Sequence, residues 1–471
     1  MKLRRNKLEP LRFDIGGALL ESCGLSLVDV DRTIAELAWV RDRVLGGNPG
    51  GPSRTPVDGD YLAETDAAYF FARPRLLLAE YEAKRMHSEL GRIFQAANRL
   101  HAACDRVVVL GSGLAYHGGR ALMESCCQPF WNELTRGERG SKPRLYFAGN
   151  DFDNDTTQGL LYWLGTLRDS NSDSEFSRWG LIVIDQGRDD WETTSLLLPF
   201  LQALRESGGR RSEGMADRLL PVTRRGSLLG QALQGLDVRD IFVLPDAPGE
   251  RYSILEVGGL LTAAVLGINV IELLQGAEAM NQHFAAAAGR QNLILQFVAI
   301  NHLLQKRGGI DRRVLSVWSQ ALERVGMWYD RLVADGSAGI PTMTMVVPRD
   351  LPSRERTGAT GAGRYPTRLY HQLLVDECRF DPLTIASPPA GDAILKGSRE
   401  NQLPGLMQAA IEHTQQVWNV MHQPSTKLFL PRVDELHLGQ LFQMLMLATW
   451  IEEHSADSSR PDHPSCPDHP S

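Results

Sequence analysis

From residue 105 onward, short runs of Val, Ile and Leu alternate with longer stretches of helical periodicity. The runs in the first part of this region are DRVVVLG, RLYFAGN, GLIVID, RLLPV and DIFVLP. Continuous apolar runs are typical of strands buried on both faces, and helices between them supply the crossovers of a parallel sheet. We therefore expect residues 101–250 to form a doubly wound αβα domain.

A second unit of the same kind is predicted for residues 251–453. RRVLSVWS, IPTMTMVV and KLFLP have the composition of strands, and helical stretches such as LPGLMQAAIEHTQQVWNVM lie between them. Residues 1–100 instead show apolar positions at helical spacing, most clearly in LLLAEYEAKRMHSELGRIFQAANRLHAA. The predicted fold class is α/β, with two doubly wound parallel-sheet αβα domains after an N-terminal helical segment.

The last residues, 454–471, are rich in Pro, Ser and Asp and contain PDHPS twice. A segment of this composition cannot bury a core, so we predict a disordered tail. Its His463, Cys466 and His469 are potential metal ligands, but we predict no resident metal and no cofactor.

The composition restricts the class of partner. The chain has 471 residues and a formal net charge of −7, which argues against a nucleic-acid binder because phosphate backbones require a basic face. Its six cysteines form neither a CxxC pair nor a dense framework, as expected in a reducing cytoplasm. The basic N-terminus lacks the apolar region of a signal peptide, and no apolar stretch reaches the roughly 20 residues that span a bilayer. We expect a cytoplasmic protein that binds neither membranes nor nucleic acids.

The segment VVVLGSGLAYHGGRAL, residues 107–122, has the order strand, glycine-rich loop, helix. Gly111 and Gly113 allow a sharp turn that exposes N–H groups at the start of a helix, where anions bind. The segment lacks a full dinucleotide fingerprint and a ribose-binding acid. On the residues alone, an anion site and a tight turn without a ligand are equal alternatives.

Residues 245–280 favour the anion site over the tight turn without a ligand. Their sequence is PDAPGERYSILEVGGLLTAAVLGINVIELLQGAEAM. It resembles a fingerprint of the glucose-6-phosphate isomerase family, in which Gly-Gly-Arg, an aromatic and Ser precede an apolar helix and a Leu-Leu-x-Gly-Ala step. The resemblance extends over about residues 100–453. The matching residues are Gly249, Arg251, Tyr252, Ser253, Gly259, Leu260, Gly267, Ile268, Leu273, Leu274, Gly276, Ala277 and Met280.

The resemblance implies sugar-isomerase (SIS) domains and interconversion of glucose 6-phosphate and fructose 6-phosphate, a step of glycolysis and gluconeogenesis. It also implies a small sugar phosphate as substrate, a homodimer and no cofactor. In the family, the arginine at the place of Arg251 stabilises the enediolate, and a fixed guanidinium at developing charge is a large catalytic contribution. Asp335 stands where the family has its glutamate base, one methylene shorter.

The phosphate-binding segments match only in part. Gly111, Gly113 and Tyr116 are in register with the family's Gly-Ile-Gly-Gly-Ser loop and the following helix, but its third glycine and its serine are Leu114 and Ala115. In LIVIDQGRDDWETTSLL, Glu192 and Thr193 match the family's cradle, while Asp185, Asp189 and Asp190 replace hydroxyl donors and Arg188 compensates in part. The predicted substrate-binding residues are Gly111, Gly113, Tyr116, Arg188, Thr193 and Gly249.

Other family positions are changed or missing. The second glycine of the fingerprint is Glu250, and the ring-opening histidine falls on Gly363 or Arg364, with His371 and His117 as remote substitutes. The C-terminal lysine has no counterpart, since the last lysine is Lys427. Three alternatives stay open: an isomerase with a reduced set of groups, an impaired homologue that binds a sugar or an isomerase subunit, and an isomerase of a less anionic sugar.

Overall fold

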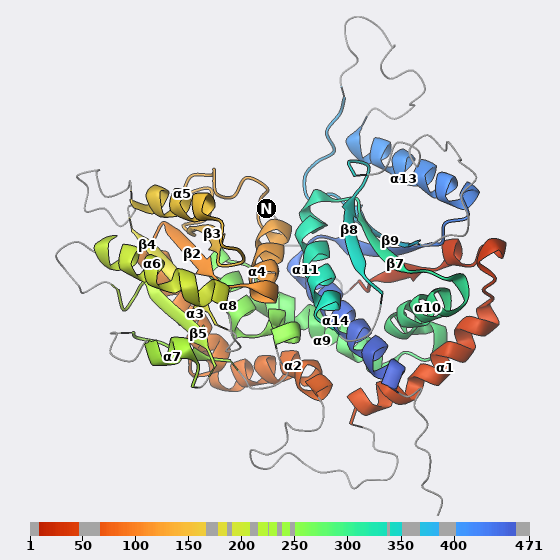
Figure 1. Cartoon of the computed structure of the whole chain (residues 1–471), viewed down its shortest axis with the longest axis horizontal. Helices are drawn as coiled ribbons and strands as arrows, with labels where there is room; N and C mark the ends of the chain where they lie inside the picture. Colours follow the sequence, from red (N-terminus) through yellow and green to blue (C-terminus); the bar gives the residue numbers. More distant parts are fainter. Residues whose placement is uncertain are drawn as a thin grey trace, which may run out of the picture.

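The computed structural model (Figure 1) describes most of the chain. Residues 454–457 of the predicted disordered tail are helical instead, because they continue the last helix. The rest of the tail lies outside the described residues, as do Arg188 and Gly249. The described residues are 9–46, 66–165, 178–185, 191–207, 215–224, 226–232, 238–244, 250–336, 340–350, 368–385 and 402–457.

The first sheet is fully parallel and has the strand order β3-β2-β4-β5-β6. Every residue of β2, β4 and β5 is buried, which explains why these strands are continuous apolar runs in the sequence. The strands are β2 (Arg106–Leu110), β3 (Arg144–Ala148), β4 (Trp179–Ile184), β5 (Leu219–Thr223) and β6 (Phe242–Val243).

Helices cover both faces of this sheet. Val108 and Leu110 pack with α5 (Asn154–Gly165) and α6 (Trp191–Ser207), and Val107 and Val109 with the helices of the other face. Those helices are α3 (Glu89–Ala103), α4 (Gly113–Cys126) and α8 (Val257–Leu266), and α8 contacts both α3 and α4. A further short helix is α7 (Leu228–Ala232). The predicted αβα arrangement is confirmed.

The second sheet has the order β1-β10-β9-β7-β8, parallel except for β1, which is antiparallel to β10. The sequence analysis did not predict β1 or β9. The strand β1 lies within the segment expected to be helical and is extended because its backbone pairs with β10. The strands are β1 (Arg12–Asp14), β7 (Arg312–Val317), β8 (Thr342–Val346), β9 (Arg368–Glu377) and β10 (Ser425–Arg432).

This sheet is also covered on both faces. Phe297 of α10 packs on His371, and Trp418 of α13 stacks on Tyr370, one residue earlier in β9 and therefore on the opposite face. The helices are α1 (Leu27–Val44), α2 (Asp66–Lys84), α9 (Val270–Ala286), α10 (Leu293–Gly308), α11 (Glu323–Ala334), α13 (Leu403–Val420) and α14 (Glu435–Asp457). Short 3₁₀ helices are η1 (Gly16–Ala18), η2 (Glu21–Cys23), η4 (Arg85–His87), η7 (Glu250–Leu255), η8 (Gly289–Gln291) and η9 (Gln320–Leu322).

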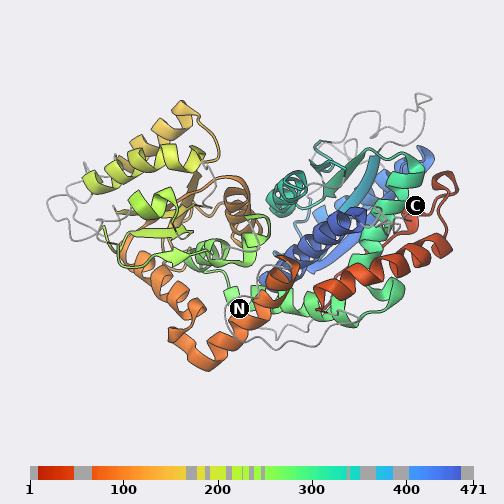
Figure 2. The same cartoon turned by 60° about the horizontal axis from the view of Figure 1, so that its bottom comes forward.

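The two sheets lie in separate lobes that meet where α4 packs against α11 (Figure 2). The helix α2, orange in Figure 2, runs between the lobes and contacts both α3 and α9. The N-terminal segment therefore belongs to both lobes.

The helices α9 and α14 approach each other through two glycines. A Cβ added at Gly276 would lie 1.9 Å from the carbonyl oxygen of Leu436, and one added at Gly439 would lie 1.9 Å from that of Leu273. Both separations are too short for any side chain, so the close contact of these helices requires glycine on each.

We expect Gly276→Ala to lower the free energy of unfolding by about 1–3 kcal/mol, because the added methyl forces the two backbones apart. The matched control is Gly159→Ala in α5, where an added Cβ meets no atom within 4 Å. It should raise stability by roughly 0.5–1 kcal/mol, since alanine is the better helix former. Urea unfolding of both variants measures the difference, and equal shifts of the two midpoints would contradict the close contact.

A buried carboxyl connects α11 to β8. Asp330 accepts a hydrogen bond of 2.8 Å from the backbone N–H of Thr344. Burial raises the pKa of Asp330 to about 6, against the hydrogen bonds from Thr344, which lower it. Because the folded state holds this proton more tightly than the unfolded chain, the associated stability is present below the usual pKa of 3.8 and is lost as the pH rises through about 6.

The substitution Asp330→Asn removes the titration and keeps an acceptor for Thr344. The stability of the variant relative to the wild type should therefore increase between pH 4 and pH 7, by up to about 3 kcal/mol. Urea unfolding of both proteins at the two pH values tests this. A difference that does not change with pH would refute the buried, protonated carboxyl.

Candidate functional site

The glycine loop has the predicted geometry. Gly111 follows β2, and a Cβ there would lie 3.3 Å from the carbonyl oxygen of Ile184. Gly113 begins α4 with φ of +54°, a conformation that favours glycine. Its N–H donates to Oδ1 of Asn150 at 3.1 Å. An amide side chain therefore already occupies one of the donors that the helix N-terminus offers to an anion.

Tyr116, a predicted substrate-binding residue, belongs to a polar chain between the lobes. Its hydroxyl accepts a hydrogen bond of 3.0 Å from Arg120, which pairs with Glu124 at 2.8 Å. Glu124 also pairs with Arg324 of α11 at 3.2 Å. The side chain of Tyr116 is thus directed into the contact between α4 and α11.

Arg251 is the most strongly held of the predicted site residues. Its Nη1 donates to Glu453 at 2.8 Å, and its Nη2 lies 2.7 Å from the other oxygen of the same carboxylate. Nη2 and Nε also donate to the carbonyl oxygen of Leu332, at 2.8 and 3.3 Å. The two charged side chains are 20% and 9% exposed, so the pair is largely withdrawn from water.

The backbone at Gly336 lies directly against this ion pair. A Cβ at Gly336 would lie 2.0 Å from an oxygen of Glu453 and 2.6 Å from Nη2 of Arg251. A side chain at this position would therefore require the ion pair to shift.

The loop that carries Arg251 is anchored by α2. The ring of Tyr252 stacks on Phe70 with centroids 4.4 Å apart. Arg73 pairs with Glu256 at 2.9 Å at the start of α8. Burial raises the pKa of the Glu256 carboxyl to about 7, while the neighbouring guanidinium acts in the opposite direction. These contacts fix the middle of η7 and the residue that follows it, and so the backbone that carries Arg251.

Asp335 lies at the end of α11, next to the carbonyl that holds Arg251. Its carboxylate pairs with Arg331, one helical turn earlier, at 3.1 Å. Burial lowers the pKa of Arg251, but Glu453, then Tyr252 and Asp335, together outweigh this effect and the pKa is raised. The structure thus brings the two predicted catalytic residues to the same helix end, each with a partner of opposite charge.

The acidic segment after β4 is described only at its ends. Asp185 is buried and accepts a hydrogen bond of 2.9 Å from the hydroxyl of Thr223 on β5. Thr193 is buried in α6. The first acid of the predicted cradle therefore faces the neighbouring strand.

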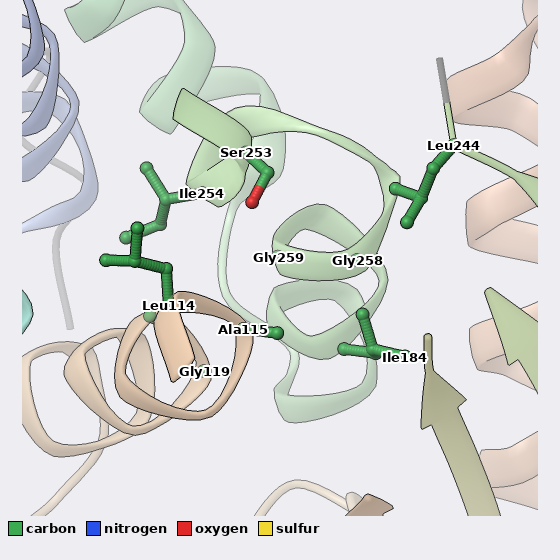
Figure 3. Close-up of a pocket in the computed structure, with 10 residues that line it drawn as sticks. Leu114, Ala115, Gly119, Ile184, Leu244, Ser253, Ile254, Gly258 and Gly259 are labelled. Carbon is green, nitrogen blue, oxygen red and sulfur yellow. The ribbon is translucent and has the colours of Figure 1, made fainter. Parts of the chain in front are cut away.

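A small hollow lies between the start of α4, η7 and α8 (Figure 3). It encloses about 10 Å³, room for about one water molecule. Leu114 and Ala115, at the family's glycine and serine positions, contribute apolar lining, and the Ser253 hydroxyl is the single side-chain oxygen among the labelled residues in Figure 3. Within the described part of the chain, this hollow does not accommodate a sugar phosphate.

The two histidines weighed as substitutes occupy different settings. His371 is buried in the middle of β9, bonded through Nδ1 to the Thr426 hydroxyl at 2.7 Å, and burial lowers its pKa to about 3. His117 lies on α4, where burial and then Arg324 lower its pKa. His371 is therefore a structural residue, as its isolated place in the sequence suggested.

Glu453 was missed by sequence reasoning. Its only signal is the acidic pair in WIEEH at the end of the last predicted helix, and its partner Arg251 lies 202 residues away. Among the described residues, no cluster of three His, Cys, Asp or Glu side chains has the arrangement of a metal site. None of the described helices is both long and apolar enough to cross a membrane.

Comparisons with known proteins relate the chain to isomerases. The profile of the phosphoglucose isomerase family matches residues 209–339. The glucose-6-phosphate isomerase of Listeria monocytogenes is 28% identical over 247 residues, 52% of each chain. That of Caldanaerobacter subterraneus is 26% identical over 318 residues, 67% of this chain and 64% of the relative. The chain thus matches about half to two thirds of the length of these curated relatives.

Solved structures share the fold. A hypothetical protein from Thermus thermophilus has a TM-score of 0.69 at 20% identity, covering 94% of this chain and 93% of the other. A glucose-6-phosphate isomerase from Chlamydia trachomatis has a TM-score of 0.57 at 16% identity, covering 90% of this chain and 73% of the other. With the fingerprint around Arg251, these findings show that the chain is similar to the glucose-6-phosphate isomerase family and support a divergent member of it.

Proposed function

We propose that this protein is an aldose–ketose isomerase that interconverts glucose 6-phosphate and fructose 6-phosphate. The observation that carries the proposal is the fixed position of Arg251 between the ends of α11 and α14, with Asp335 at the same helix end. Asp335 takes the proton from C2 of the open-chain aldose and returns it to C1, while the hydroxyl proton of O2 passes to O1 so that C2 becomes the carbonyl. Arg251 stabilises the negative oxygen of the enediolate formed between these two steps.

The carboxylate of Glu453 sets a condition on this mechanism. It neutralises the guanidinium that the enediolate requires, so the substrate oxygen must displace Glu453 before Arg251 can act. An ion pair held by two close N–O contacts resists displacement, because each charged hydrogen bond contributes about 1.5–3 kcal/mol. We therefore expect turnover of the wild-type protein to be slow.

The same ion pair favours a second candidate function. In this alternative the protein is a catalytically impaired homologue that binds a sugar or pairs with an intact isomerase subunit. Glu453 then occupies Arg251 permanently, in keeping with the apolar hollow at Leu114 and Ala115. The absence of a histidine at the family's ring-opening position supports this alternative as well.

The family resemblance supports three further proposals. The protein is a homodimer, it is cytoplasmic, and its reaction belongs to glycolysis and gluconeogenesis. Light scattering coupled to size-exclusion chromatography tests the dimer, for which the expected mass is twice the 52.3 kDa of the chain.

The isomerase proposal predicts opposite effects for the two members of the ion pair. With fructose 6-phosphate in an assay coupled to oxidation of glucose 6-phosphate, Arg251→Ala should lower kcat/KM by about 100-fold or more. Glu453→Gln should raise it by about 10-fold, since the guanidinium loses its charged partner. Arg75→Ala, at an exposed position of α2, is the control for removal of an arginine and should leave the rate unchanged.

One combination of results would reject the proposed isomerase activity. Wild-type turnover equal to that of Arg251→Ala, together with no gain for Glu453→Gln, would leave the impaired homologue. A thermal-shift titration with fructose 6-phosphate and with fructose then separates binding of the phosphosugar from binding of a neutral sugar, because a ligand of the native state raises the melting temperature.

A further inference from the structure

A second cavity lies at the edge of the first sheet, between α3 and the segment that leads into β6. It is open to solvent and has a volume of about 330 Å³, and its lining consists of Arg92, Gln95, Arg99, Arg239 and Asp240. The hollow beside the glycine loop instead includes Leu244, which follows β6, and shares none of these five residues. The two spaces are therefore distinct and lie at opposite ends of the outermost strand.

The cavity carries an excess of positive charge. Arg99 forms an ion pair with Asp240 across the cavity wall, and Arg239 pairs with Asp217 at 2.7 Å. Arg92 lies over the ring of Phe242, 5.3 Å from the centroid, and forms no ion pair with any described residue. Within the described part of the chain, one guanidinium charge is thus left without a carboxylate partner.

The position of Arg92 suits it to bind an anion. A guanidinium on an aromatic face keeps its N–H groups in the plane of the fork, where they match the oxygens of a phosphate or carboxylate. The residue is exposed on α3 one turn before Gln95 and two turns before Arg99, so the three side chains share a helix face. The opposite face of α3 is apolar and packs on α8. The polar face is therefore not needed for the contact of α3 with α8.

The size and lining of the cavity limit the class of ligand. Its volume is at the lower end of the range for small-molecule sites, about 300–1,000 Å³, and exceeds the needs of a single phosphate ion. All five lining side chains are charged or carry an amide, which disfavours an apolar ligand. We propose that this cavity binds a small anion with at least two adjacent phosphate groups. The inference does not depend on the proposed isomerase activity.

Inorganic pyrophosphate is a suitable probe, measured by titration calorimetry on the full chain at low ionic strength. Arg92→Gln should weaken pyrophosphate binding by about 10-fold or more, since one charged bidentate partner is lost. Arg75→Gln removes the same charge from an exposed position of α2 and should leave the affinity unchanged. Arg251→Ala should also leave it unchanged, because Arg251 does not line this cavity.

The following results would contradict the proposed anion site at Arg92. Absence of binding to the wild-type protein, or equal weakening by Arg75→Gln, would overturn it in favour of diffuse charge attraction. Weakening by Arg251→Ala would assign the binding to the isomerase site instead. Inorganic phosphate that binds as tightly as pyrophosphate would refute the requirement for two groups. A thermal melt of Arg92→Gln confirms folding, and Arg92→Lys, which keeps the charge but not the fork, should bind with intermediate affinity.

Discussion

Two adjacent glutamates near the end of α14 hold η7, β7 and α10 in place. Glu453 binds Arg251 of η7, and Glu452 binds Arg313 at the start of β7 with both oxygens at 2.8 Å. Glu452 also accepts a hydrogen bond of 2.6 Å from Asn301. The side chain of Arg313 is 1% exposed, and a charge so deeply buried is tolerated only with a partner. One helix end thus sets the positions of the second sheet and of the loop with the family fingerprint.

The contacts of Arg251 affect two of its properties in opposite ways: they fix its position, and they neutralise its charge. The scaffold keeps Arg251 rigid and close to Asp335, which is what stabilisation of an enediolate requires. The same contacts neutralise the guanidinium, and the neighbouring helix start has apolar side chains where the family has glycine and serine. A charge balance of this kind is altered by a single side chain, whereas the fold depends on many.

The sequence predicted those parts of the structure that depend on local pattern. The strands β2, β4 and β5 are apolar throughout because both faces of their sheet are covered. The strand β9 was missed because its centre carries the polar residues His371 and Gln372. Their hydrogen-bond partners are Thr426, Gln415 and Trp318, each more than 40 residues away in the chain. Glu453 was missed for the same reason. Residues that act through distant partners leave no periodic signal, whereas Arg251 was recognised because the segment around it is contiguous.

The path of the N-terminal segment has a consequence for the whole molecule. It supplies β1 as an edge strand of the second sheet, passes between the lobes as α2 beside Phe284 and Tyr252, and then covers the first sheet as α3 before either parallel sheet has started. The second lobe is therefore not a continuous stretch of sequence, because the first lobe is inserted between β1 and the rest of it. Synthesis of the first lobe is therefore complete long before β1 acquires its partner β10, so a strand that leaves the ribosome early is among the last elements to reach its final neighbours.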